Sequence, residues 1–529
     1  MRKLLALSVA LALAGCATYT VQQPKAEYLT ILHTNDNHGR FWQNEKGEYG
    51  MSARKTLVDR LRNEAEKNGH AVLLLSGGDI NTGVPESDLQ YAEPDFKGMR
   101  LLGYDAMAIG NHEFDNPLHI LDKQIKWAQF PILSANILNK SDASHAYQPY
   151  TIIEKNGLKI GVIGLTTVDT VKIANPEYVG HLDFIKPSIA AKKVLNDINN
   201  KYENIDVTIA VTHMGHYHDA QYGINAPGDV TLARELPKGA LHMVIGGHSQ
   251  EPVCVDSLGN PDKDFAPGKA CKPDNQNGTW IMQAHEWGKY VGKAEFKIEG
   301  DKVTLENYQL IPVNLKSDTG EVIGEYIPED QQMLALLKPF KKIGEGQLDL
   351  PIGFTDAYLD GKRDTVRFKQ SPLARLIIKA QRESVKADFG LISGGGIRHS
   401  IEAGEISYKD VLKVHPFKNR ITVMNWIGKD LIDYLEVVTS FPIDAGAYLQ
   451  YEGLSFERNN GKLVNIKING ESLELNKTYR MSINSYNAAG GDGYPVLVGR
   501  KGFVPSERTD AEVLKAYIEK YSPIKVSEL

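Results

Sequence analysis

Five short polar segments of the 529-residue chain carry side chains that could bind metal ions. In chain order they are Asp36-Asn37-His38, Gly77-Gly78-Asp79, Gly110-Asn111-His112-Glu113-Phe114-Asp115, Thr212-His213 and Gly246-Gly247-His248-Ser249-Gln250. Imidazole and carboxylate ligands suit Zn²⁺ or Mn²⁺, and none of the five segments contains a cysteine. Any one segment has an ordinary explanation as a turn or as a structural histidine. The five together indicate a metal centre.

Each segment follows a short apolar run within a few residues. These runs lie at 29–32, 71–75, 106–109, 207–211 and 243–245, and a further run lies at 160–163. Continuous apolar runs, separated by helix-like stretches at 52–67 and 187–198, predict strands that are covered on both faces. Sites in open α/β sheets form at the carboxyl ends of the strands. The sequence therefore predicts a layered α/β domain whose strand ends gather the five segments.

Length and composition indicate a globular protein of more than one domain. The chain is longer than the roughly 250–300 residues at which a single core stops growing, and 42% of its residues are hydrophobic. A polar boundary at 329–350 contains a helix-like stretch at 330–342, and 354–529 mixes predicted helices (373–385, 429–439) with strands (389–393, 463–468, 479–483). We expect a second, α+β domain there, of about 170 residues. The net charge of −6 gives no support for binding a nucleic-acid polymer.

The N-terminus has the features of a targeting signal. Arg2 and Lys3 precede an apolar stretch at 4–14, and Leu13-Ala14-Gly15-Cys16 resembles the lipobox of bacterial lipoproteins. The stretch is shorter than the roughly 20 residues that span a bilayer. We expect a signal peptide at 1–15, lipid on Cys16, a tether at 16–27, and anchoring to the outer membrane, facing the periplasm or the cell surface. The alternative is an ordinary secretory signal in which Cys16 is incidental.

The chain has three cysteines, so Cys254 and Cys271 remain if Cys16 carries lipid. In an oxidising periplasm these two are expected to pair. The pair would close a loop worth about 3 kcal/mol in the chain-entropy account of disulfides.

The five segments, in this order, resemble the motif series of the calcineurin-like metallophosphoesterase superfamily. The whole mature chain resembles the bacterial 5′-nucleotidase and UDP-sugar hydrolase family. This resemblance implies an α/β fold: a four-layer α/β/β/α metallophosphoesterase domain at 28–329, a linker helix or hinge at 330–353, and a smaller α+β nucleotide-binding domain at 354–529. It also implies a rotation of the second domain during turnover, and we expect a monomer.

The resemblance further implies two divalent metal ions, Zn²⁺, Mn²⁺, Co²⁺ or Mg²⁺. Asp36, His38, Asp79 and Gln250 would hold one ion; Asp79, Asn111, His213 and His248 would hold the other. Such a pair clamps a phosphate and lowers the pKa of bound water from 15.7 to about 7. His112 precedes Asp115 by three residues, so this carboxylate can orient the imidazole for catalysis.

In the second domain the resemblance implies a nucleotide-binding pocket. Its residues would be Arg363, Arg367 and Arg398 for phosphate or carboxylate oxygens, Phe417 and Tyr486 stacked on either side of the base, Asn419 at the base edge, and Asp492 on the ribose hydroxyls. Arginine suits such oxygens through its planar fork, and base stacking is tolerant of base identity. Tyr486 replaces the commoner Phe, and Lys418 replaces the commoner Gly.

The sequence thus predicts a dimetal phosphohydrolase that releases phosphate from nucleoside 5′-monophosphates. Nucleoside di- and triphosphates and UDP-sugars are expected as further substrates. Two alternatives stay open. One is a 2′,3′-cyclic-nucleotide phosphodiesterase with 3′-nucleotidase activity, and the other is a surface lipoprotein that captures nucleotides without hydrolysis.

Overall fold

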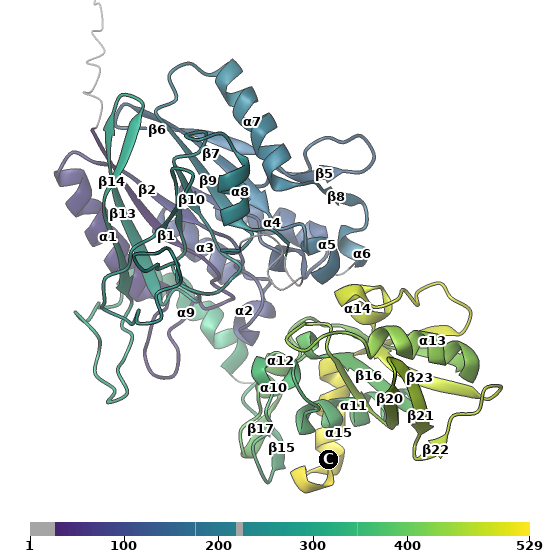
Figure 1. Ribbon diagram of the computed structural model, residues 1–529. Coiled ribbons are helices and arrows are strands. Elements are labelled where there is room, and N and C mark those ends of the chain that lie inside the picture. Colours follow the sequence, from purple (N-terminus) through teal and green to yellow (C-terminus); the bar gives the residue numbers. More distant parts are fainter. Residues whose placement is uncertain (1–26, 175, 218–225, 346–347) are drawn as a thin grey trace, which may run out of the picture.

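The computed structural model describes residues 27–174, 176–217, 226–345 and 348–529. They form two domains, coloured purple to teal and green to yellow in Figure 1. The predicted signal peptide, Cys16 and the tether up to residue 26 lie outside the described residues. Among the helices that the structure describes, none combines the length and the apolar composition that a membrane span requires.

The first domain is built on two six-stranded mixed sheets (Figure 1). The first sheet has the order β14 (Lys302–Pro312), β13 (Tyr290–Glu299), β1 (Tyr28–Thr34), β2 (Ala71–Ser76), β3 (Ala106–Ala108), β4 (Ile132–Leu133). The second has the order β11 (Asp274–Gln276), β12 (Thr279–Met282), β10 (Met243–Ile245), β9 (Val207–His213), β7 (Leu158–Thr166), β6 (Tyr150–Lys155). Strands β1 to β3 run parallel, as do β7, β9 and β10. Each parallel group therefore ends at one edge of its sheet.

Helices cover the outer faces of both sheets. α1 (Met51–Lys67), α3 (Glu93–Leu102) and α9 (Gln331–Glu345) pack together over the first sheet, and α7 (Pro187–Lys201) and α8 (Asp229–Glu235) cover the second. Between the sheets, β3 contacts β7 and β9. The remaining elements are α2 (Pro85–Asp88), η1 (His112–Phe114), α4 (Leu118–Ala128), β5 (Ile137–Asn139), α5 (Thr170–Ile173), α6 (Pro176–Val179) and β8 (Leu182–Phe184). This arrangement confirms the predicted layered α/β fold.

The second domain is α+β. Its main sheet has the order β19 (Leu449–Glu452), β16 (Phe389–Ser393), β23 (Thr478–Asn484), β18 (Arg420–Ile427), β24 (Phe503–Thr509). Smaller sheets pair β15 (Pro351–Thr355) with β17 (Gly404–Ser407), and join β20 (Leu454–Asn459), β21 (Lys462–Ile468) and β22 (Glu471–Ser472). The helices are α10 (Arg363–Val366), α11 (Pro372–Val385), α12 (Tyr408–Val414), α13 (Gly428–Val438), α14 (Ser485–Ala488) and α15 (Asp510–Tyr521), with short turns η3 (Gly394–Gly396), η4 (Gly491–Gly493) and η5 (Val526–Glu528).

The predicted helix at 330–342 is α9, and it packs as part of the first domain. Met333 and Leu337 are fully buried in the core that the helix shares with α1 and α3. The residues expected to form a linker thus begin inside the core of the first domain.

Cys254 and Cys271 form a disulfide with an S–S distance of 1.98 Å, as expected. Both side chains are buried in the first domain.

Candidate active site

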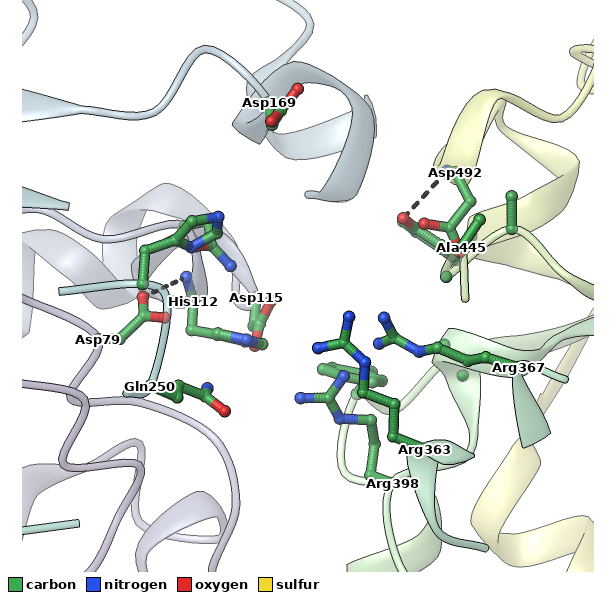
Figure 2. A pocket seen from close by; sticks show the side chains of 18 of the residues that line it. Asp79, His112, Asp115, Asp169, Gln250, Arg363, Arg367, Arg398, Ala445 and Asp492 are labelled. Atoms are coloured by element: carbon green, nitrogen blue, oxygen red, sulfur yellow. Dashed lines mark hydrogen bonds and ion pairs between the residues drawn. The ribbon is translucent and has the colours of Figure 1, made fainter. Parts of the chain in front are cut away.

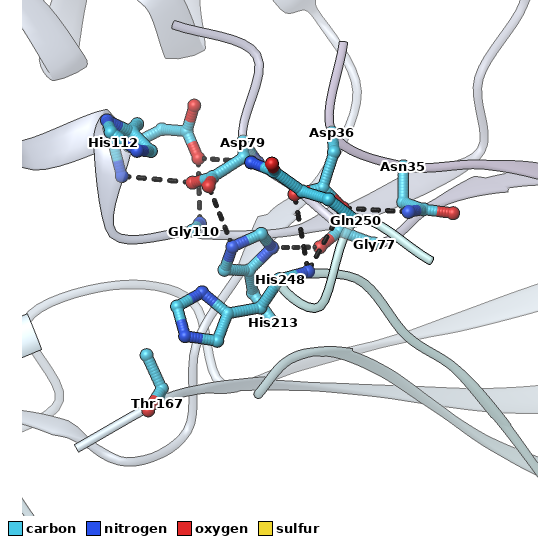
Figure 3. A network of polar contacts seen from close by, with 12 residues as sticks. Asn35, Asp36, Gly77, Asp79, Gly110, His112, Thr167, His213, His248 and Gln250 are labelled. Carbon is cyan, nitrogen blue, oxygen red and sulfur yellow. Dashed lines mark hydrogen bonds and ion pairs between the residues drawn. The ribbon is translucent and has the colours of Figure 1, made fainter. Parts of the chain in front are cut away.

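The five polar segments converge because five parallel strands end beside one another. These strands are β1, β2 and β3, which are parallel neighbours in one sheet, and β9 and β10, which are parallel neighbours in the other. Figure 3 shows residues from all five segments in a single network around Asp79. The network joins the facing edges of the two sheets.

The backbone at this network is held in an unfavourable conformation. Five predicted ligands have positive φ angles: Asp36 (51°), His38 (49°), Asp79 (56°), His248 (82°) and Gln250 (57°). A residue held in this region costs of order 1–3 kcal/mol. Such strain concentrates at functional sites, where the surrounding fold imposes it.

Glycines let the strand ends approach one another. A Cβ atom on Gly110 would lie 2.1 Å from Asp79 Oδ1, and one on Gly77 would lie 2.2 Å from the Gly246 carbonyl oxygen. Either contact is far inside van der Waals distance. The glycines of these motifs are therefore needed for close packing of the site loops.

Asp79 stands at the centre of two clusters that could each hold a metal ion. One cluster is His38, Asp79 and His112, the other Asp79, His213 and His248, with their ligand atoms within 4.8 Å of one another. His213 Nε2 lies 2.8 Å from Asp79 Oδ2. Asp36 joins the first cluster, with Oδ1 3.7 Å from His38 Nε2, and Gln250 Nε2 lies 2.8 Å from the same nitrogen. The structure thus brings the predicted ligands together.

The imidazoles are oriented as metal ligands require. His213 Nδ1 donates to the Gly77 carbonyl at 2.6 Å. His38 Nδ1 lies 3.1 and 3.0 Å from the carbonyl oxygens of Asn81 and Thr82. Bonds of this kind fix the tautomer and leave the lone pair on Nε2 facing the site. Asn111 Oδ1 is buried without a hydrogen-bond donor. This donor set fits divalent metal ions.

The electrostatics of the cluster also favour a cation. Burial raises the pKa of Asp79, but the nearby His213 and His112 imidazoles outweigh it and hold this pKa well below its usual range. Burial lowers the pKa of His213, but the carboxylates of Asp79 and Asp36 raise it to about 10. The buried carboxylates are thus balanced by positive charge, which a bound metal ion can supply.

His112 and Asp115 form a pair at the mouth of the cluster. His112 Nδ1 lies 2.6 Å from Asp115 Oδ2, and Thr82 Oγ1 donates to the same carboxylate oxygen at 2.6 Å. Burial lowers the pKa of His112, but the carboxylates of Asp115 and Asp79 raise it to about 9. The carboxylate thus orients the imidazole, as the spacing predicted.

A cavity of about 400 Å³ extends from this site into the second domain. The predicted residues that line it are Asp79, Asn111, His112, Asp115, His248, Gln250, Arg363, Arg367, Arg398, Phe417, Asn419, Tyr486 and Asp492. Asp36, His38 and His213 are buried beside it. One cavity therefore joins the two groups of predicted residues.

Three arginines give the second-domain wall of this cavity a positive charge. Figure 2 shows Arg363, Arg367 and Arg398 grouped across from Asp115 and Gln250. Burial lowers the pKa of Arg367 to about 10, and the neighbouring guanidinium groups act in the same direction. A cluster of mutually repelling cations is suited to an anionic ligand.

One aromatic side chain of the second domain reaches the proposed catalytic histidine of the first. The Phe417 ring stacks on His112, with centroids 6.1 Å apart and an interplanar angle of 9°. The Arg398 guanidinium lies 5.5 Å from the Phe417 ring centre. Tyr486 OH accepts a hydrogen bond from the Asp492 backbone N–H at 3.0 Å, so tyrosine adds a bond that phenylalanine lacks.

Several residues that shape the site were not predicted from the sequence. Glu113 accepts hydrogen bonds from the backbone N–H groups of Gly110 (2.7 Å) and Ile80 (2.8 Å), which ties two strand ends together. Its position inside the third polar segment was the available signal. Asp169 and Tyr217 line the cavity from loops, and no local motif marks them.

Comparison with known families agrees with this geometry. Residues 29–252 match the family described as calcineurin-like phosphoesterase, and residues 351–499 match the 5′-nucleotidase C-terminal domain. Fold and site therefore define a metallophosphoesterase domain joined to a 5′-nucleotidase C-terminal domain.

Similar proteins match over nearly their full length. A 5′-nucleotidase of Vibrio cholerae is 54% identical over 538 residues, covering 100% of this chain and 97% of the relative. Protein UshA of Escherichia coli is 54% identical, covering 99% and 96%. A crystal structure of a 5′-nucleotidase precursor from Thermus thermophilus has a TM-score of 0.73 and 28% identity, covering 93% and 96%. The chain belongs to the 5′-nucleotidase family.

Proposed function

We propose that the protein hydrolyses nucleoside 5′-monophosphates to nucleosides and phosphate, and that nucleoside di- and triphosphates and UDP-sugars are further substrates. One observation carries this proposal: a single cavity is lined by metal-ligand candidates of the first domain and by arginines and aromatic rings of the second. The 54% identity to proteins described as 5′-nucleotidase and UshA supports it.

Two divalent metal ions, Zn²⁺, Mn²⁺, Co²⁺ or Mg²⁺, fit the donor set. Their ligands would be Asp36, His38, Asp79 and Gln250 for one ion, and Asp79, Asn111, His213 and His248 for the other. Ions bound in such a pair polarise phosphoryl oxygens and lower the pKa of coordinated water. Asp79 suits the shared position because its carboxylate has two oxygens that can point to different centres.

The protein side chains position the substrate and stabilise developing charge. His112 donates a hydrogen bond to the phosphoryl group through Nε2, because Asp115 occupies Nδ1. The assigned substrate contacts are Arg363, Arg367 and Arg398 with phosphate oxygens, Phe417 and Tyr486 with the base faces, Asn419 with the base edge, and Asp492 with the ribose.

The proposal is tested by product analysis with AMP, UDP-glucose and 2′,3′-cyclic AMP, each with Mn²⁺ or with EDTA. We expect adenosine and phosphate from AMP, cleavage of UDP-glucose, and loss of both activities in EDTA. Activity on 2′,3′-cyclic AMP alone would favour the 2′,3′-cyclic-nucleotide phosphodiesterase. Nucleotide binding without any product under all metals would favour a capture lipoprotein.

We also propose that lipid on Cys16 anchors a monomer to the outer membrane, facing the periplasm or the cell surface. The lipobox-like Leu13-Ala14-Gly15-Cys16 supports the anchor. Fractionation of cells that express the full chain or Cys16→Ser tests it. We expect the substitution to move the protein from the outer-membrane to the soluble fraction. An unchanged distribution would contradict the anchor, and size-exclusion chromatography tests the monomer.

A further inference from the structure

A buried hydrogen-bond network lies behind the loop that carries His248 and Gln250. Its members are Thr212, Asp229 and Gln283, and all three are fully buried. Thr212 Oγ1 donates to Asp229 Oδ1 at 2.6 Å, and Gln283 Nε2 donates to Asp229 Oδ2 at 3.1 Å. Thr212 lies in β9, Asp229 begins α8, and Gln283 directly follows β12. The network therefore joins three elements of the first domain.

The network fixes the orientation of the Gln283 amide. A carboxylate only accepts hydrogen bonds, so the amide nitrogen faces Asp229 and the amide oxygen faces the loop. There Ser249 Oγ donates to Gln283 Oε1 at 2.6 Å. The backbone carbonyl of Gln283 also accepts from the Val253 N–H at 3.3 Å. Gln283 thus holds the loop at two points.

The bond from Ser249 lies between two residues in an unfavourable backbone conformation. His248 has a φ angle of 82° and Gln250 one of 57°. Residues persist in this region only where the surrounding structure imposes it. The support is closely packed, because a Cβ atom on Gly246 would lie 2.3 Å from Asp229 Oδ2. The network is therefore placed to impose the conformation of the loop.

We propose that Gln283 is a positioning residue for the metal centre: through Ser249 it holds the loop so that His248 and Gln250 face their metal ions. The inference rests on the proposed role of these two side chains as ligands of different ions. Losing a hydrogen-bond partner behind the ligands of a metal typically costs about 10–100-fold in metal affinity or activity. We expect the low end of this range, because the bond acts through the backbone between the two ligands.

The test measures Mn²⁺ affinity by calorimetric titration of the metal-free full chain without substrate. It compares the wild type, Gln283→Met, Ser249→Ala and the double variant. Methionine has a side chain of similar length to glutamine but carries no amide. We expect each single variant to weaken Mn²⁺ binding about tenfold. The double variant should bind no more weakly than Gln283→Met, because both substitutions remove the same bond.

Two controls separate positioning from general destabilisation. Gln450→Met changes an equally buried glutamine of the second domain, whose Nε2 donates to the Val366 and Lys369 carbonyl oxygens at 2.7 Å. It should lower the Tm but leave Mn²⁺ affinity unchanged. Ser249→Thr keeps the hydroxyl group and should bind Mn²⁺ within about twofold of the wild type. If Gln283→Met does not fold, Ser249→Ala against Ser249→Thr decides, because Ser249 is only partly buried at the cavity.

The outcomes are distinguishable. Weaker binding in Gln283→Met and Ser249→Ala, without a further loss in the double variant and with normal binding in both controls, supports the inference. Additive losses, a loss in only one of the two single variants, or an equal loss in Gln450→Met overturn it. Normal Mn²⁺ affinity in both single variants overturns it while the proposed metal sites and 5′-nucleotidase activity stand. A wild type that binds no Mn²⁺ would overturn those metal sites together with the inference.

Discussion

His112 is the residue at which the metal-ligand cluster, a carboxylate and the second domain meet. Its Nδ1 is bonded to Asp115, its backbone N–H donates to Asp79 Oδ1 at 2.9 Å, and its ring stacks on Phe417. Asp115 and Phe417 thus hold the ring, while the bond to Asp79 holds the backbone below it. Nε2 is the nitrogen that remains for a substrate oxygen.

We expect His112→Ala to lower kcat for AMP about 10²–10⁴-fold, because it removes the positioned donor. Metal content should stay unchanged, since Asp79 and the other ligand candidates keep their positions. Steady-state kinetics and elemental analysis of the same sample measure both quantities. His119→Ala, at an exposed histidine of α4, should leave both unchanged. Loss of metal from His112→Ala would instead make His112 a ligand.

At the scale of elements, the strand ends can approach only where glycine leaves room. Gly110→Ala would place a methyl group against Asp79 Oδ1, and overpacking of this kind costs about 1–3 kcal/mol. We expect it to displace the Asp79 carboxylate and to abolish most metal binding and turnover, with a Tm lowered by a few degrees. Calorimetric metal titration and a thermal melt measure these effects.

Gly161→Ala is the matched control for this substitution. Gly161 lies within β7, and its new methyl group would meet no atom closer than 3.7 Å. Metal binding should therefore stay normal. Normal metal affinity in Gly110→Ala would show that the loop relaxes without moving Asp79.

The elements that the sequence predicts well are those with continuous apolar runs. β10 and β16 begin and end as predicted, because strands buried on both faces contain little else than apolar residues. β13 and β14 lack such runs and were not predicted. In β13, buried residues alternate with partly exposed ones, because its two faces have different surroundings. The metal-ligand candidates were predictable because each lies at the end of a strand or within a few residues of it.

Contacts between distant segments were not predictable in this way. Asp510 meets Asn419 only through the pairing of β18 with β24. Asp169 and Tyr217 reach the cavity only through the packing of their loops. Neither a local pattern nor a composition bias accompanies such residues, because their partners are set by tertiary structure.

At the scale of the whole molecule, the short helix α2 of the first domain carries a glutamate that contacts lysines of two other helices. Glu86 is buried, and its Oε1 lies 2.7 Å from Lys409 Nζ on α12 and 3.1 Å from Lys341 Nζ on α9. Burial raises the pKa of Glu86, but these two ammonium groups outweigh it and lower the pKa. Glu86 therefore ties the second domain to the first.

Lys418 makes a second contact between the domains. Its Nζ donates to the Asp88 carbonyl oxygen at 3.4 Å and lies 4.6 Å from the Tyr91 ring centre. The side chain thus points to the first domain, although Lys418 follows Phe417 directly in the chain. Lys418 stands where glycine is commoner, and its contacts are those of an interdomain tether.

The double variant Lys409→Ala, Lys418→Ala tests whether these contacts hold the observed arrangement. We expect KM for AMP to rise about three- to tenfold. The Lys409–Glu86 ion pair contributes up to about 1 kcal/mol, the Lys418 hydrogen bond contributes about 1 kcal/mol, and the cavity needs both domain walls. X-ray scattering should show a larger radius of gyration without substrate. Lys429→Ala, at an exposed lysine of α13, removes charge from the same domain away from α2 and should change neither quantity. If the double variant also leaves KM and the radius of gyration unchanged, the lysine contacts add nothing to the arrangement. Burial at the domain interface would then set it alone.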